Sequence, residues 1–331
     1  MKSKRMTAAS ERPLAVFTDL GELDPAPGVE VLEEGGFRVA VSAGPAADQV
    51  AEAAHEAVAL VAGYARIDAA LFDRLPGLRI VATMAAGYDN VDTSAATERG
   101  IWVCNLPDGA TEEVAVYALT LALMLVRSIP EALSTVRAGG WAEDLTRLGR
   151  RPSTLTMGVV GLGRIGAKLA TLAAPLFGTV LGYDPYLPPG SEPTGVARAG
   201  LEELVGRADV VSLHLPLTPE TAALVGPSLL EGFKSGSFLV NTSRGGLIDE
   251  AALLAALESG PLGGAALDVF AAEPLPVGSP LRVHPRILAT PHVAYLSEES
   301  MRDYVVKPAR NLVAWLQDGR PLTPVAGPSA S

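Results

Sequence analysis

The sequence has a single cysteine, Cys104, among its 331 residues. One cysteine excludes a disulfide within the chain, and no Cys/His pair has the spacing of a zinc site, so we expect no metal. A reducing compartment, the cytoplasm, is the simplest location. Residues 1–5 are basic, but no apolar stretch follows them directly, so the N-terminus does not indicate a secretory signal.

Long hydrophobic runs and excess positive charge are also missing. The longest strongly apolar segment, residues 114–126, is shorter than the ~20 residues that cross a bilayer, so we expect no membrane partner. The formal net charge of -11 argues against nucleic acid or an anionic membrane as a partner, but still allows a local basic pocket for a small anion. With 48% hydrophobic and 19% charged residues, the chain is long enough for two domains with cores.

Short apolar runs alternate with helical stretches in both halves of the chain. This alternation predicts two separate parallel α/β units, with no fixed-period repeat. The expected strands are residues 14–18, 37–42, 57–61, 79–83 and 101–104 in the first half, and 156–160, 179–183, 210–215, 238–242, 265–269 and 287–290 in the second. A helix is expected over residues 298–316, where Pro308 should kink or divide it. The Pro/Gly-rich stretch 321–331 predicts a tail.

A glycine fingerprint, GLGRIG at residues 161–166, directly follows one of these strands. In such a strand-turn-helix, Gly161 permits the turn, Gly163 allows a pyrophosphate to approach the backbone, and Gly166 allows close packing of the helix on the sheet. Free N–H groups at the helix start attract phosphates. The fingerprint predicts a dinucleotide site, although glycine-rich turns also occur for packing alone.

Asp184 narrows the choice of dinucleotide. It lies 23 residues after Gly161 and directly after the next strand. A carboxylate there accepts hydrogen bonds from both ribose hydroxyls and repels a 2'-phosphate, and the next residues offer no guanidinium to neutralise one. Asp184 therefore favours NAD over NADP. Its alternative role is that of a solvated turn residue before Pro185.

Three later strand ends carry a cation, a carboxylate and an imidazole: Arg244, Glu273 and His292. A guanidinium binds a carboxylate, an imidazole moves a proton at neutral pH, and a neighbouring carboxylate favours the charged imidazole. Reduction of a 2-keto acid by NADH needs these three functions. Taken singly, each residue also fits a surface or turn position. Of the four histidines, only His292 combines a strand end with such neighbours.

Several motifs together resemble the NAD-dependent D-2-hydroxyacid dehydrogenases. The resemblance extends from about Leu14 to about Pro321, and the motifs are GLGRIG (161–166), NTSRG (241–245) with LIDE (247–250), LDVF (267–270) with Glu273-Pro274, and TPH (290–292). It implies that His292 is the acid/base, that Glu273 is its carboxylate partner, and that Arg244 binds the substrate carboxylate. It also implies that backbone N–H groups near Ala86 and Gly87 bind the same carboxylate.

The resemblance further implies a two-domain α/β fold. A doubly wound Rossmann NAD-binding domain (108–296) would follow a flavodoxin-like substrate domain (1–107), residues 297–331 would return to the latter, and the active site would lie in the cleft between them. Arg164 and Ile165 would lie at the pyrophosphate, Asp184 at the adenosine ribose and Asp268 near the nicotinamide amide. Further cofactor contacts are expected at Thr111, Leu215, Pro216, Thr221 and Thr242. A homodimer would form through the NAD domain, using the apolar helix from Val114 and the arm 137–151.

Departures from the family pattern bear on the substrate and on the function. Val116 stands where many relatives carry an acidic residue. Met84 stands where phosphoglycerate dehydrogenases often place an arginine, and their regulatory domain does not follow residue 331. A small substrate such as glyoxylate or hydroxypyruvate is therefore expected.

Two alternatives remain. Relatives with the same three residues oxidise phosphite, so a phosphite or hydroxyphosphonate dehydrogenase is one. The other is an NAD-sensing interaction protein, because residues 184–187, 292–295 and 297–299 are similar to the C-terminal-binding-protein branch.

Overall fold

The computed structural model describes residues 12–21 and 23–328. These residues form two compact units: one joins the chain up to Gly109 with the segment from Ser297, and the other spans Ala110–Leu296. The predicted domain boundaries lay after residues 107 and 296. The basic segment 1–5 lies outside the described residues.

The first unit is a six-stranded sheet in the order β13-β5-β4-β3-β1-β2. All neighbouring strands are parallel except β13, which runs antiparallel to β5. The strands are β1 (Leu14–Phe17), β2 (Arg38–Val41), β3 (Ala57–Ala62), β4 (Ile80–Thr83), β5 (Trp102–Cys104) and β13 (Pro324–Ala326). Strand β13 corrects the prediction that residues 321–331 are only a tail.

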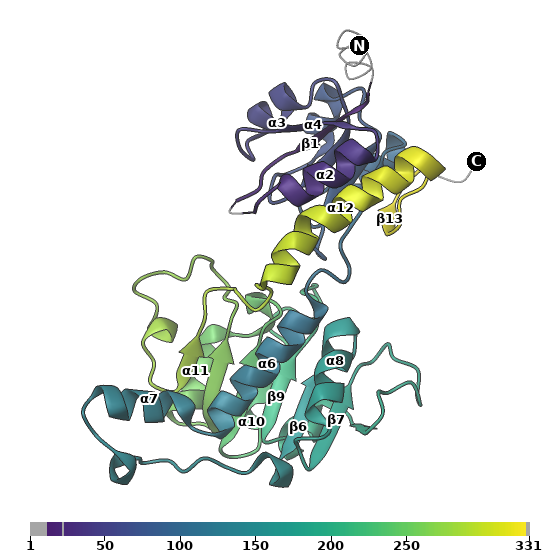
Figure 1. Cartoon of the computed structure of the whole chain (residues 1–331). Coiled ribbons are helices and arrows are strands. Elements are labelled where there is room, and N and C mark those ends of the chain that lie inside the picture. The colour runs from purple at the N-terminus through teal and green to yellow at the C-terminus, as the bar shows by residue number, and fades with distance from the viewer. Residues whose placement is uncertain (1–11, 22, 329–331) are drawn as a thin grey trace. The chain divides into compact units, whose positions relative to one another are not determined.

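Helices cover both faces of this sheet. On one face, α2 (Ala26–Glu34) and α12 (Glu298–Asp318) lie side by side (Figure 1) and enclose a core that includes Phe17, Leu32 and Leu312. The other face is covered by α3 (Ala47–Ala53), α4 (Ala69–Arg74) and α5 (Thr93–Glu98). The alternation of strand side chains explains the two cores, because Leu14 and Val16 face one layer whereas Ala15 and Phe17 face the other.

Helix α12 continues through Pro308 over its full 21 residues. Of the two predicted effects of Pro308, a kink or a division of the helix, the division is therefore wrong. Proline removes one backbone N–H donor and strains the preceding turn. Pro308 is buried where α12 packs on the sheet and on α2, and this packing outweighs the local preference.

The second unit is a seven-stranded, fully parallel sheet in the order β12-β11-β10-β9-β6-β7-β8. Its strands are β6 (Thr156–Val160), β7 (Thr179–Tyr183), β8 (Val196–Arg198), β9 (Val210–Leu213), β10 (Ser237–Asn241), β11 (Leu262–Leu267) and β12 (Ile287–Ala289). The order reverses between β6 and β9. Ligands of doubly wound sheets bind at the carboxyl ends of the strands beside such a switch point, and this is where Gly161 lies.

The helices of the second unit enclose two cores, one on each face of the sheet. Helices α6 (Thr111–Val126) and α8 (Arg164–Ala173) cover one face, and α9 (Leu201–Arg207), α10 (Pro227–Glu231) and α11 (Glu250–Glu258) cover the other. Helix α7 (Ile129–Arg137) has no buried residue. Short 3-10 turns complete the unit: η1 (Ala142–Asp144), η2 (Pro152–Thr154), η3 (Gly245–Leu247) and η4 (Pro280–Arg282). The expectation of two parallel α/β units is confirmed.

Among the described residues, no single helix is long and apolar enough to cross a bilayer. Helices α6 and α7 meet the length and composition criteria only as a pair, and that pair is bent by 64°.

Candidate active site

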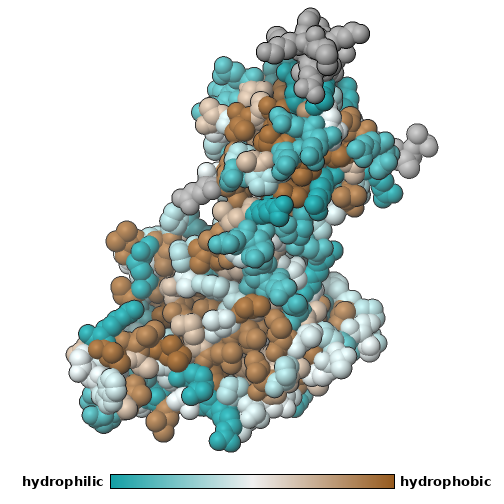
Figure 2. Space-filling model, in the orientation of Figure 1, coloured by the Kyte–Doolittle hydropathy of each residue, from teal (hydrophilic) through white to brown (hydrophobic). Residues whose placement is uncertain are grey.

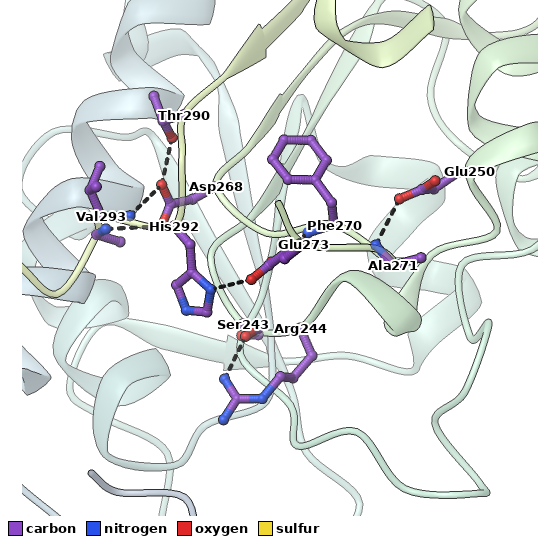
Figure 3. Close-up of polar contacts among 11 residues, drawn as sticks. Ser243, Arg244, Glu250, Asp268, Phe270, Ala271, Glu273, Thr290, His292 and Val293 are labelled. Atoms are coloured by element: carbon purple, nitrogen blue, oxygen red, sulfur yellow. Dashed lines mark hydrogen bonds and ion pairs between the residues drawn. The ribbon is translucent and has the colours of Figure 1, made fainter. Parts of the chain in front are cut away.

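His292 and Glu273 form a hydrogen-bonded pair at the carboxyl end of the second sheet. The Nδ1 atom of His292 lies 2.7 Å from Oε2 of Glu273, and the side chains are 44% and 35% exposed (Figure 3). The other carboxylate oxygen, Oε1, accepts a hydrogen bond of 2.9 Å from the backbone N–H of Phe270. Because a carboxylate only accepts, the pairing places a proton on Nδ1 and leaves Nε2 as the reactive nitrogen.

The backbone of His292 has a left-handed conformation, with φ of 56°, which is uncommon outside glycine. Asp268 holds the segment on both sides of it. Its fully buried carboxylate accepts hydrogen bonds from the Thr290 hydroxyl (2.6 Å) and from the backbone N–H groups of Val293 (3.0 Å) and Ala294 (2.9 Å). The ring also meets the ring of Tyr295 edge to face. These contacts orient the imidazole toward Glu273.

Arg244 lies in a turn after β10, and Asn241, the last residue of that strand, stabilises the turn with two hydrogen bonds. Asn241 Nδ2 donates to the carbonyl of Arg244 at 2.9 Å, and its Oδ1 accepts from the Ser243 N–H at 3.0 Å. The guanidinium is exposed and donates to the Ser243 carbonyl at 2.8 Å. Directly after it, the Cα of Gly245 packs on the next loop, because an added Cβ would lie 1.9 Å from the carbonyl carbon of Phe270. The arginine turn and the Glu273 loop are therefore in contact.

The glycine turn after β6 has the features needed to hold a pyrophosphate. Gly161 has φ of +92°, and an added Cβ there would lie 2.4 Å from the His214 carbonyl oxygen; at Gly166 it would lie 1.9 Å from the Gly161 carbonyl oxygen. No atom lies within 4 Å of the corresponding position at Gly163, the N-cap of α8. Arg164 and Ile165 form the first turn of that helix. The turn therefore fits a dinucleotide, with open space where the backbone meets the phosphates.

Asp184 and Thr242 add to this fit. Oδ2 of Asp184 accepts the Leu162 N–H at 2.9 Å, and Oδ1 accepts the Tyr186 N–H, so the carboxylate is fixed beside the glycine turn. The hydroxyl of Thr242 is buried and has no hydrogen-bond partner among the described residues. A bound ligand with a polar group would satisfy it.

The remaining predicted cofactor residues lie in the loop after β9 and at the start of α6. The Thr221 hydroxyl donates to the Pro216 carbonyl at 2.7 Å and accepts from the Thr218 N–H at 2.8 Å, so it already stabilises its own loop. Leu215 and Pro216 lie in the same loop after β9, and Thr111 is the first residue of α6. Their contacts with a cofactor stay predictions.

Ala86 and Gly87 lie in the first unit, in the loop after β4. Ala86 is exposed, and its carbonyl accepts from Asn105 Nδ2 at 2.7 Å. The predicted contact of their N–H groups with a substrate carboxylate stays a prediction. Met84 is buried in the core of this unit, and its bearing on the choice of substrate stays a prediction.

A comparison with protein families decides the assignment of the chain. Residues 119–294 match the NAD binding domain of the D-isomer specific 2-hydroxyacid dehydrogenases. The chain belongs to this family. The resemblance derived from the motifs, the Rossmann fold of the second unit and the use of NAD are thereby confirmed.

Relatives of this dehydrogenase include a glyoxylate reductase and a D-3-phosphoglycerate dehydrogenase. It is 41% identical over 253 residues to a glyoxylate reductase of Korarchaeum cryptofilum, covering 75% of this chain and 76% of that protein. It is also 41% identical over 259 residues to the D-3-phosphoglycerate dehydrogenase of Mycobacterium tuberculosis, covering 78% of this chain but only 49% of the longer relative.

A solved structure extends the likeness over nearly the whole chain. The NADPH-dependent glyoxylate/hydroxypyruvate reductase of Sinorhizobium meliloti, solved with NADP and malonate, matches with a TM-score of 0.82 and 31% identity. The match covers 97% of this chain and 100% of that one.

Sequence reasoning did not find three residues that build the candidate site. Thr290 and Tyr295 fix the His292 segment, and Glu250 accepts the Ala271 N–H at 2.8 Å. Thr290 and Glu250 lie inside the quoted motifs, so position in a motif was a signal, but only the geometry reveals their partners. His214 also lies at the switch point, and burial lowers its pKa to about 4.

Proposed function

We propose that the chain interconverts a small 2-keto acid and its D-2-hydroxy acid with NAD(H), with glyoxylate and hydroxypyruvate as the first candidate substrates. The observation that carries this proposal is the 2.7 Å hydrogen bond between His292 and Glu273, in a loop cluster that also bears Arg244. The similarity to a glyoxylate reductase and to a glyoxylate/hydroxypyruvate reductase supports the choice of substrate.

His292 acts as the acid/base in this proposal. Glu273 holds Nδ1, so Nε2 faces the substrate oxygen and donates its proton as the carbonyl becomes an alkoxide. In the reverse direction, neutral Nε2 takes the proton from the hydroxyl group. Glu273 orients the ring through Nδ1 during this exchange, and Asp268 keeps the segment of His292 in place. Bound NADH supplies the hydride for reduction, and NAD accepts it for oxidation.

Arg244 binds the substrate carboxylate in this proposal. Its exposed guanidinium offers two parallel N–H donors, the geometry that suits a carboxylate. Fixed positive charge beside the carbonyl also stabilises the negative charge that develops on its oxygen. The glycine turn would hold the pyrophosphate of the cofactor, and Asp184 would bind the adenosine ribose and disfavour a 2'-phosphate.

A substrate screen tests the proposal. NADH oxidation is measured with glyoxylate, hydroxypyruvate, pyruvate and 3-phosphohydroxypyruvate, and NAD reduction with the matching hydroxy acids, phosphite and hydroxyphosphonates. Turnover with a small keto acid supports the proposal, and turnover only with the phosphorylated keto acid or a phosphorus oxyacid changes the substrate class. No turnover at saturating NADH would favour the NAD-sensing interaction role.

His292→Asn then tests the mechanism. We expect kcat to fall roughly a hundredfold to ten-thousandfold, with NADH binding retained. His55→Asn is the matched control, because His55 is an exposed histidine of the first unit. Unchanged turnover in His292→Asn would remove this residue from the mechanism.

We also propose a cytoplasmic homodimer that forms through the second unit. Large apolar side chains are exposed on α6, on α7 and in the following segment, and Figure 2 shows hydrophobic residues gathered over these helices. They are Val116, Ile129, Leu133, Val136, Trp141 and Leu148. A surface of this kind is typical of a protein interface. Light scattering of the wild type and of Leu133→Asp tests it; a monomeric wild type would contradict the proposal.

A further inference from the structure

Glu250 lies at the edge of the site and has no role in the proposed chemistry. It is the first residue of α11, directly after the N-cap Asp249. Its Oε1 atom accepts a hydrogen bond of 2.8 Å from the backbone N–H of Ala271 (Figure 3). Ala271 belongs to the loop that carries Glu273, so this carboxylate joins the start of α11 to the loop of the acid/base pair.

Two successive backbone amides of that loop bind two different carboxylates. The Phe270 N–H donates to Glu273 at 2.9 Å, and the Ala271 N–H donates to Glu250 at 2.8 Å. Charge-assisted hydrogen bonds of this kind are stronger than neutral ones. Glu250 binds the second amide, whereas Glu273 uses one oxygen for the first amide and directs its other oxygen at His292.

The segment from Arg244 to Glu250 also contacts the loop of Glu273 through Gly245. Gly245 packs so closely that an added Cβ would lie 2.2 Å from the Phe270 carbonyl oxygen and 2.4 Å from the Ala271 nitrogen. Gly245 directly follows Arg244, and Glu250 lies five positions further on, after the buried Leu247 and Ile248. The Phe270–Ala271 peptide is therefore held between the residue next to the arginine and the carboxylate of Glu250.

We propose that Glu250 is a positioning residue that sets the Phe270–Ala271 peptide and, through it, the distance between Glu273 and His292. The inference rests on the proposed function, because it assumes that the pair transfers the proton. Loss of the Glu250 contact frees the Ala271 N–H, and Glu273 then has a competing donor that draws it away from His292. A displacement of about 1 Å in such a site costs up to about a hundredfold in rate.

A pair of conservative variants tests the inference. Glu250→Gln keeps the length of the side chain and an acceptor oxygen, whereas Glu250→Asp keeps the charge but is one methylene too short to reach Ala271. We expect Glu250→Gln to retain kcat within about threefold, and Glu250→Asp to lose at least about tenfold and to change the pH profile of kcat. Glu258→Asp, at the exposed far end of α11, is the matched control and should behave like the wild type.

A role limited to the helix predicts the opposite order. Negative charge in the first turn stabilises a helix, so Glu250→Asp would then be the better variant and Glu250→Gln the worse. That order, or equal activity of both variants and the Glu258 control, would overturn the inference. Thermal unfolding and NADH binding are measured in parallel, and a fall in kcat with both retained is the expected result.

Combination with Glu273→Gln separates a failure of the inference from a failure of the proposed function. If Glu250 acts through the pair, Glu250→Asp should cost less than about twofold in the Glu273→Gln background, because coupled residues are not additive. Equal losses in both backgrounds would overturn the inference while leaving the proposed function intact. Full activity of Glu273→Gln and His292→Asn would instead overturn the proposed function and, with it, this inference.

Discussion

Acidification should destabilise the folded protein through His214. This residue follows β9 at the switch point, and its Nε2 lies 2.8 Å from the hydroxyl of Ser212. Part of the residue reaches solvent, but Nδ1 is buried and has no hydrogen-bond partner among the described residues. Desolvation disfavours a charged imidazole and lowers the pKa of His214 to about 4.

The magnitude follows from linkage between protonation and folding. The unfolded chain binds a proton at His214 near pH 6.5, whereas the folded protein does so only near pH 4. The folded pKa is the lower one, so the contribution of neutral His214 to stability is fully present above pH 6.5 and is lost as the pH falls toward 4. The full effect is about 3 kcal/mol of unfolding free energy, and about 2.5 kcal/mol of it is lost by pH 4.5.

Comparison with His214→Gln isolates this contribution from that of the carboxylates that titrate in the same range. Urea unfolding, followed by circular dichroism at pH 7.5, 6.5, 5.5 and 4.5, gives the unfolding free energy of each variant. The difference between wild type and His214→Gln should change by about 2.5 kcal/mol across this series, with the wild type losing more.

His55→Gln is the control, because this histidine is exposed and its replacement should leave the pH dependence as in the wild type. Parallel curves for wild type and His214→Gln would refute the reasoning, as would an NMR titration that gives His214 an ordinary pKa.

Three further predictions test other contacts. Burial favours the neutral form of Asp209, but hydrogen bonds from Lys234, the Thr156 N–H and Arg150 outweigh it and lower the pKa of its carboxyl. The ionised carboxylate therefore stabilises the fold above its unfolded pKa, and this contribution is lost as the pH falls through the folded pKa. Asp209→Asn should lower the unfolding free energy at pH 7 by roughly 1–3 kcal/mol, and the exposed Asp48→Asn by under about 0.5, in urea unfolding; equal losses would contradict this. Asp184→Ala should raise the NADPH/NADH affinity ratio at least about tenfold in fluorescence titrations, and an unchanged ratio would remove its role in cofactor choice. Gly166→Ala should lower both NADH affinity and melting temperature, whereas Gly163→Ala should lower affinity alone; a stable, NADH-binding Gly166→Ala would contradict the crowding at that position.

The sheet and the ends of its strands were predictable because both depend on local pattern. Each expected strand of the second unit is present, and parallel order brings the carboxyl ends of neighbouring strands to one edge. Arg244, Glu273 and His292 therefore lie on adjacent loops, after β10, β11 and β12. Their grouping needed only the correct assignment of three strands and their order.

Helix α2 was not predicted from the sequence, because the contacts that stabilise this helix come from a distant part of the chain. Its sequence begins Ala26-Pro27-Gly28, which gives a weak helical pattern. Gly28 is required because an added Cβ would lie 2.7 Å from the carbonyl oxygen of Val305 in α12. The close approach of α12 thus requires glycine at position 28, and no short window of sequence contains both Gly28 and α12.

Asp268 demonstrates that a motif identifies a residue more securely than its role. The family pattern implied a contact with the nicotinamide amide, which stays a prediction, and the structure adds three hydrogen bonds that the carboxylate accepts from the segment around His292. These bonds hold the left-handed turn at His292, a conformation that is uncommon outside glycine. A turn of this kind persists only where its surroundings hold it, and the buried Asp268 carboxylate supplies that restraint. Any contact with the cofactor must therefore add to these bonds rather than replace them, because losing them would release the proposed acid/base from its position.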